Sequence, residues 1–166
     1  GATIRDCLIE DNTAVNDGGG LRLSGEAAGV VEDCVLRGNL AGDRGGGLVL
    51  DEVGADTTVT RLTIVDNRAF DAGGGGLQLD LSEGMLEAVV VRGNEAAFSG
   101  GGVEIRGGLP RLVGCTIEGN FASSLGGGLV TRESAAVIDT SFVRSNGTGG
   151  FSSGGGVASS TKDAAI

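Results

Sequence analysis

The 166-residue chain has no histidine, tryptophan or tyrosine, and only one lysine (Lys162) and one proline (Pro110). Without histidine, it lacks the side chain that most often serves in acid–base catalysis and metal binding. Without tryptophan and tyrosine, it lacks the amphipathic rings that line sugar-binding platforms. We therefore predict no catalytic residue, no cofactor and no metal site.

Positive charge is also scarce, because 12 basic residues stand against 22 acidic ones and the net charge is −10. Nucleic acids and anionic membranes both attract basic surfaces, so neither is expected as a partner. No apolar run approaches the length of a membrane span, and we expect no direct insertion of this segment into a membrane.

Glycine is abundant, with 34 residues and no Gly-X-Y period that would indicate collagen. It is concentrated in six triplets, each followed by two apolar residues at alternate positions, at 18–20, 45–47, 74–76, 100–102, 126–128 and 154–156. Each triplet is preceded by an asparagine, at Asn12, Asn39, Asn67, Asn94, Asn120 and Asn146. Successive asparagines are 27, 28, 27, 26 and 26 residues apart, and such a period indicates a repeat architecture.

Four columns of the repeat are small or apolar in nearly every copy; in the second they are Val31, Cys34, Leu36 and Ala41. Residues two apart share a strand face, so Cys34 and Leu36 point the same way. Val31 is out of phase with them, which predicts a bend near Asp33 and its counterpart Arg61. The apolar pair after each triplet again shares a face.

Each repeat therefore holds three short strands separated by bends, and the chain is predicted to be an all-β parallel β-helix of about six rungs. We place one domain over 1–166, with rungs near 1–27, 28–55, 56–82, 83–108, 109–134 and 135–166. Gly73 and two residues within 147–153 are insertions that belong in turns. The pattern runs to both ends, so we expect further rungs or a cap beside it in the native protein. A leucine-rich-repeat-like solenoid is the alternative fold, but it would need a helix or 3₁₀ segment where the glycines stand.

The repeat Asn-x-Ala-x-x-x-Gly-Gly-Gly-Leu resembles the right-handed parallel β-helix repeats of bacterial surface proteins, in particular the polymorphic outer-membrane-protein repeat. It differs in having a third Gly in place of Ala, and Ile, Leu or Val in place of Phe three residues before the Asn. The resemblance implies a right-handed coil, secretion, an extracellular or cell-surface location, and often adhesion. It brings no catalytic motif.

We interpret the asparagine column as a structural ladder, in which stacked amides satisfy backbone groups at a bend. Glycosylation is the other interpretation, and only Asn146-Gly147-Thr148 has the required pattern. The glycine triplets match neither a phosphate loop nor a calcium-binding nonapeptide, so they are interpreted as corners that permit close stacking.

The three cysteines, Cys7, Cys34 and Cys115, match no zinc or disulfide framework. They stand at equivalent inward positions, so buried thiols are the favoured interpretation. A Cys7–Cys34 bond between adjacent rungs stays an alternative.

Two outward columns flank the inward residue that lies three positions before each Asn. We propose them as the candidate interaction face, with members Leu8, Val35, Val90, Phe142, Arg37, Arg92, Glu118 and Arg144. Opposite charges on adjacent rungs predict the pairs Glu10–Arg37, Arg92–Glu118 and Glu118–Arg144. An apolar stripe on a surface often marks a partner, here a protein or a glycan.

The sequence thus favours a structural and interaction module, an adhesin-like or passenger-like rod of a secreted or surface protein. A polysaccharide-acting lyase or hydrolase is the alternative, although its carboxylates, such as Asp51, Asp56 and Asp80, look scattered in loops. An ice-binding solenoid would need regular outward threonine rows, which Thr63 and Thr116 alone do not supply.

Overall fold

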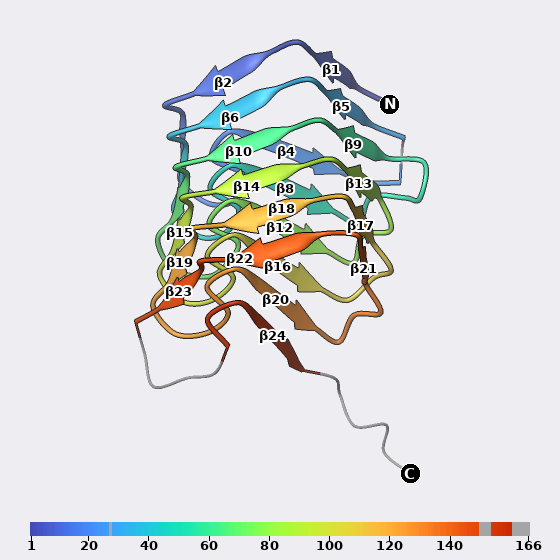
Figure 1. Ribbon diagram of the computed structural model, residues 1–166. Coiled ribbons are helices and arrows are strands. Elements are labelled where there is room, and N and C mark those ends of the chain that lie inside the picture. The colour runs from blue at the N-terminus through green and yellow to red at the C-terminus, as the bar shows by residue number, and fades with distance from the viewer. Residues whose placement is uncertain (27, 150–153, 161–166) are drawn as a thin grey trace.

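A computed structural model describes residues 1–26, 28–149 and 154–160, and within these ranges the chain forms 24 strands and no helix. The strands lie in four parallel six-stranded sheets, stacked as a β-solenoid of six rungs (Figure 1). The predicted all-β parallel solenoid is confirmed.

Each sheet takes one strand from every rung. Sheet A contains β1 (Thr3–Arg5), β5 (Val30–Glu32), β9 (Thr58–Thr60), β13 (Met85–Glu87), β17 (Arg111–Val113) and β21 (Val137–Asp139). Sheet B contains β2 (Leu8–Glu10), β6 (Val35–Arg37), β10 (Thr63–Val65), β14 (Val90–Arg92), β18 (Thr116–Glu118) and β22 (Phe142–Arg144). Sheet C contains β3 (Thr13–Ala14), β7 (Leu40–Ala41), β11 (Arg68–Ala69), β15 (Glu95–Ala96), β19 (Phe121–Ala122) and β23 (Gly147–Thr148). Sheet D contains β4 (Leu21–Ser24), β8 (Leu48–Asp51), β12 (Leu77–Asp80), β16 (Val103–Arg106), β20 (Leu129–Arg132) and β24 (Val157–Ser160).

The three predicted strands of each rung are those of sheets A, B and D. Sheet C adds a two-residue strand directly after each asparagine, which the sequence pattern did not separate from the turn. Every strand of the first five rungs pairs in parallel with its counterpart one rung later, as in the register Ile9↔Leu36. Equivalent positions of the repeat therefore lie directly above one another.

The corners between strands have left-handed backbone. In the second rung these residues are Asp33 (φ 53°), Gly38 (φ 62°), Gly45 (φ 63°) and Glu52 (φ 54°). Arg61 has φ 49°, so the bend predicted near Asp33 and Arg61 is confirmed. Aspartate and glycine suit such corners because they tolerate positive φ better than bulky residues do.

The core lies inside the coil and contains the predicted inward columns. In the middle rungs their side chains are essentially inaccessible to solvent, as for Val31, Leu36, Leu62, Ile64, Val91, Leu112 and Ile117. The apolar pairs of sheet D close the opposite side, with Leu48 and Leu50 both fully buried. Burial of such columns is the main favourable term in holding the rungs together.

The asparagines form a continuous ladder along one inner corner. The side-chain amide Nδ2 of Asn67 donates to Asn94 Oδ1 at 2.9 Å, and the backbone N–H of Asn67 donates to the same oxygen at 2.9 Å. The same pair of bonds joins every successive asparagine of the column. Asn67 Nδ2 also donates to the carbonyl oxygen of Leu36 in the preceding rung, at 3.0 Å.

The ladder engages Asn146 as well, since its Nδ2 donates to Ile117 O at 2.9 Å. Both polar atoms of each buried amide are therefore satisfied, which buried groups require. The structural interpretation of the column is thus supported at every rung.

The glycine triplets permit this close stacking. A Cβ atom on Gly47, the third glycine of its triplet, would lie 2.7 Å from Gly76 O and 3.0 Å from Asn67 Nδ2. A Cβ atom on the middle residue Gly46 would overlap the carbonyl oxygen of Gly75. No larger residue fits between the rungs at these two positions.

Three sequence-based expectations need correction or limits. The leucine-rich-repeat alternative is wrong, because strands of sheet D follow the triplets in the described residues. Cys34 and Cys115 are buried free thiols as predicted, whereas Cys7 is exposed because only one neighbouring rung covers it among the described residues. The predicted insertion within 147–153 falls partly on 150–153, outside the described residues.

Candidate functional site

The predicted interaction face is the outer surface of sheet B. One column of this face runs Leu8, Val35, Thr63, Val90, Thr116 and Phe142, and each member is partly or fully exposed. Leu8 and Phe142, at the two ends of the column, are 56% and 64% exposed. The structure therefore brings these residues together in the predicted order.

The charged column of the same face is only partly paired. Arg37 forms an ion pair with Glu10, and Arg144 forms one with Glu118 at 2.8 Å. The predicted Arg92–Glu118 pair is absent from the described residues, because Glu118 is engaged by Arg144 instead. Val65, in the same column, is only 8% exposed, so this position adds little accessible surface to the face.

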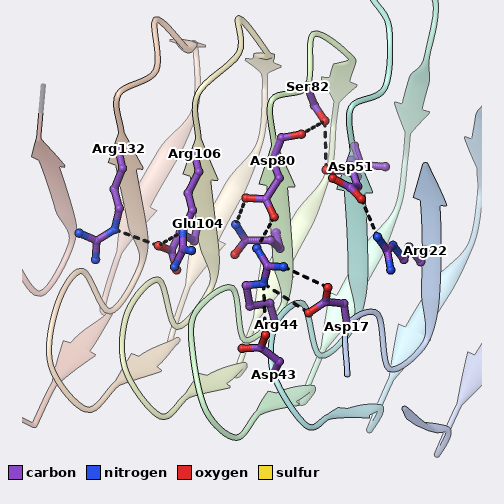
Figure 2. Close-up of polar contacts among 12 residues, drawn as sticks. Asp17, Arg22, Asp43, Arg44, Asp51, Asp80, Ser82, Glu104, Arg106 and Arg132 are labelled. Carbon is purple, nitrogen blue, oxygen red and sulfur yellow. Dashed lines mark hydrogen bonds and ion pairs between the residues drawn. The ribbon is translucent and has the colours of Figure 1, made fainter. Parts of the chain in front are cut away.

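A second candidate site lies on the outer surface of sheet D, where charged side chains from five rungs meet (Figure 2). The strand-end residues Asp51, Asp80, Arg106 and Arg132 stand in register on β8, β12, β16 and β20. Two carboxylates are thus followed along the solenoid axis by two guanidinium groups. Parallel in-register pairing alone places them side by side.

Glu104 is the centre of the basic half. Its side chain is fully buried, and its Oε1 accepts hydrogen bonds from Arg106 Nε at 2.9 Å and Arg132 Nε at 3.0 Å. Its Oε2 accepts a bond from Ser99 Oγ at 2.9 Å. A Cβ atom on Gly73 would collide with this carboxylate, so the extra glycine of the third rung provides its space.

Arg44 is the centre of the acidic half. It forms ion pairs with Asp17 at 3.1 Å, Asp43 at 3.6 Å and Asp80 at 2.6 Å, and it joins the first three rungs. Desolvation of Arg44 is outweighed by Asp80 and Asp17, which raise the pKa of its guanidinium. Asp51 is paired with Arg22 at 2.6 Å.

Asp80 is less stabilised as an anion than these contacts suggest. Burial raises the pKa of its carboxyl, although Gln78 Nε2 donates to it at 2.7 Å and Arg44 is close. A carboxyl in this state is easier to protonate than an ordinary aspartate. The side chain of Gln78 is itself fully buried beside it.

An open groove of about 670 Å³ runs between the two halves, lined by Arg44, Asp51, Asp80, Leu81, Arg106, Gly107, Gly108, Arg132 and Glu133. Leu81 stands at its edge with φ 47° and a side chain 63% exposed, and a Cβ atom on Gly107 would lie 2.6 Å from its Cδ2. Its left-handed backbone is that of the recurring corner after each sheet D strand, where Glu52 (φ 54°) and Glu133 (φ 49°) stand in other rungs.

The sequence pattern does not predict this site. The interpretation of Asp51 and Asp80 as scattered loop residues is wrong, because both end strands and are direct neighbours. The repeat does contain evidence for their proximity. Asp51 and Asp80 each stand three residues after the first apolar residue that follows the glycine triplet of their rung. The partners Asp17 and Arg44 lie in turns, whose side-chain directions the period does not predict.

The part of the chain that the structure describes contains no group of three or more His, Cys, Asp or Glu side chains placed to hold a metal ion. Nor does it contain a helix with the length and apolarity that crossing a membrane demands.

Comparison of the chain with family models, with curated proteins and with solved structures finds no match. The β-solenoid architecture therefore rests on the structure itself. The resemblance to polymorphic outer-membrane-protein repeats gains no support from these comparisons and stays a prediction.

Proposed function

We propose that this chain is a structural and interaction module, a rod of stacked rungs in a secreted or cell-surface bacterial protein of adhesin-like or passenger-like type. The observation that carries the proposal is the contrast between an inner ladder repeated in every rung and outer faces that vary. A rod of this kind holds varied side chains at fixed spacing along one axis, as other solenoids do for extended binding surfaces.

The outer face of sheet B is the proposed contact surface, with a protein or a glycan as partner. Support comes from its exposed ends, Leu8 and Phe142, and from the half-exposed aliphatic residues between them. A stripe of this type loses unfavourable contact with water when a partner covers it. Flanking rungs or a cap of the same protein would extend the rod.

The test uses the full-length native protein and two sets of substitutions. The face variant carries L8S, V35T, V90T and F142S, and the matched control carries V30T and V137S on the outer face of sheet A. We expect an antibody against this segment to label intact cells, and adhesion to host-derived surfaces to fall only in the face variant. A protein that no antibody reaches on intact cells, or equal adhesion by both variants, would contradict the proposal.

A polysaccharide-acting enzyme is the second candidate, and the groove on sheet D is the observation that favours it. There, a carboxyl with a raised pKa, Asp80, lies near Arg106, a guanidinium that could face an acidic sugar. Turnover of polyuronates, measured with and without calcium, distinguishes this candidate from the rod. Turnover that disappears in an Asp80→Asn variant would favour the enzyme over the module.

A further inference from the structure

Arg106 and Arg132 are held as a matched pair. They are register partners on β16 and β20, and both use Nε to bind the same oxygen of Glu104, at 2.9 and 3.0 Å. The carboxylate that holds them is fully buried, so it cannot swing out to solvent. Each guanidinium is thereby fixed through its Nε edge before any ligand arrives.

The other donors of the pair remain available at the groove. Arg106 makes no other side-chain hydrogen bond to the described residues, and Arg132 makes one more, from Nη2 to Ser99 Oγ at 3.3 Å. Their side chains are 39% and 30% exposed, and both line the groove together with Gly107 and Gly108. Arginine Nη groups presented side by side suit the oxygen atoms of a carboxylate or sulfate.

The net charge of this half of the groove also favours binding of an anion. Two guanidinium groups share one carboxylate here, which leaves one positive charge uncompensated within the trio of Glu104, Arg106 and Arg132. The nearest acidic residue of the register, Asp80, is already paired with Arg44 at 2.6 Å. A ligand oxyanion would therefore complete the charge balance of this half of the groove.

We infer that Arg106 and Arg132 form a binding site for a single oxyanion group, a carboxylate or a sulfate, on a ligand that lies in the groove. The inference does not depend on surface display or adhesion. The chain's net charge of −10 repels polyanions at long range, so the ligand carries isolated anionic groups rather than a dense series of them. Asp51, Asp80 and Glu133, which also line the groove, would favour hydroxyl or ammonium donors elsewhere on that ligand.

The test is an NMR titration of the arginine Nε–H signals with sodium acetate and, separately, with sodium sulfate, at constant ionic strength. We expect the Arg106 and Arg132 signals to shift saturably, with dissociation constants on the order of millimolar for such small probes. Arg106→Gln should weaken binding about tenfold or more, and Arg106→Lys should weaken it too, because lysine keeps the charge but loses the planar fork. Tighter sulfate binding would indicate a sulfated ligand, and tighter acetate binding a carboxylated one.

Arg111→Gln is the matched control, because Arg111 is an exposed arginine on the outer face of sheet A and should not affect the titration. Backbone amide spectra of each variant check that the rungs stay folded. The inference is overturned by linear, non-saturating shifts, by equal shifts at Arg111, or by unchanged binding in a folded Arg106→Gln variant. Stronger binding of a dense polyanion such as polyphosphate would also overturn it.

Discussion

The inner corner of the solenoid and the outer surface of sheet D stabilise the same rungs in different ways. At the inner corner an asparagine and three glycines recur in all six rungs, and each asparagine is hydrogen-bonded to the asparagine of the next rung. On sheet D one register position carries aspartate in two rungs and arginine in the next two, and its side chains form ion pairs that join rungs, such as Asp51–Arg22 and Arg132–Glu104. Identical residues at equivalent positions stabilise the stacking of rungs, whereas a binding site requires the residue type to change from rung to rung.

The largest effect should come from the glycine stack. Gly101→Ala places a Cβ atom against the backbone carbonyl of Phe121, which no side-chain rotation can relieve. We expect a loss of at least about 4 kcal/mol in the free energy of unfolding, or no folded protein at all. Gly114→Ala is the control, because its Cβ atom would meet nothing within 4 Å and Ala88 already occupies the equivalent corner with φ 52°. It should cost about 1 kcal/mol, and similar denaturant midpoints for the two variants would contradict the stacking account.

The buried carboxylate of sheet D should give the next largest effect. Replacing both Arg106 and Arg132 by alanine leaves Glu104 buried without a cation, which typically costs about 3–5 kcal/mol. Adding Glu104→Gln to that double variant should restore much of the lost stability, because the unpaired buried charge is then gone. Urea unfolding of the three proteins checks this, and a triple variant less stable than the double one would contradict it.

Breaking the ladder at one rung should cost somewhat less. Asn94→Ala removes the acceptor for both the backbone and side-chain N–H groups of Asn67, and a donor to Ile64 O. We expect a loss of about 1–3 kcal/mol, since the orphaned groups are buried. Arg22→Ala, which removes only an exposed ion pair with Asp51, should stay within about 0.5 kcal/mol. Equal losses in denaturant melts would show that inside and outside are wrongly assigned.

The smallest expected effect is on the pH dependence of stability, through two aspartates whose pKa values shift in opposite directions. Burial raises the pKa of Asp80, while the hydrogen bond from Arg61 lowers the pKa of Asp33. Asp80 should therefore reduce stability as the pH rises from its unfolded pKa, about 3.9, through its higher folded pKa. Asp33 contributes stability above about pH 3.9 that is lost as the pH falls through its lower folded pKa.

Carboxyl-carbon NMR titration of the folded protein measures both groups. We expect Asp80 to titrate at a higher pH than Asp33, and Asp80→Asn to remove the higher transition. The reverse order would contradict the assignment of Asp80 as a partly buried carboxyl.

The difference between the two regions also explains what could be predicted from the sequence. Columns such as those of Leu36 and Asn39 could be predicted because the same residue type recurs at a fixed period. Residues one period apart lie directly above one another in a solenoid. The charged groove was missed because the residue type at its register position changes from aspartate at Asp51 and Asp80 to arginine at Arg106. The role of Gly73 could not be predicted either, since a Cβ atom there would collide with Glu104 and Ser99 O of the next rung, which the sequence does not place beside it.

Hydrogen exchange of the asparagine side-chain amides tests the central claim, that a continuous inner ladder holds the rungs together. Asn39, Asn67, Asn94 and Asn120 are at most 1% exposed and bonded on both sides, whereas Asn12 is exposed and Asn16 lies outside the ladder. We predict that the Nδ2 protons of the four buried residues exchange at least roughly a thousandfold more slowly than those of Asn12 and Asn16, because their exchange requires opening of the rungs. Equally fast exchange at all six asparagines would contradict the account.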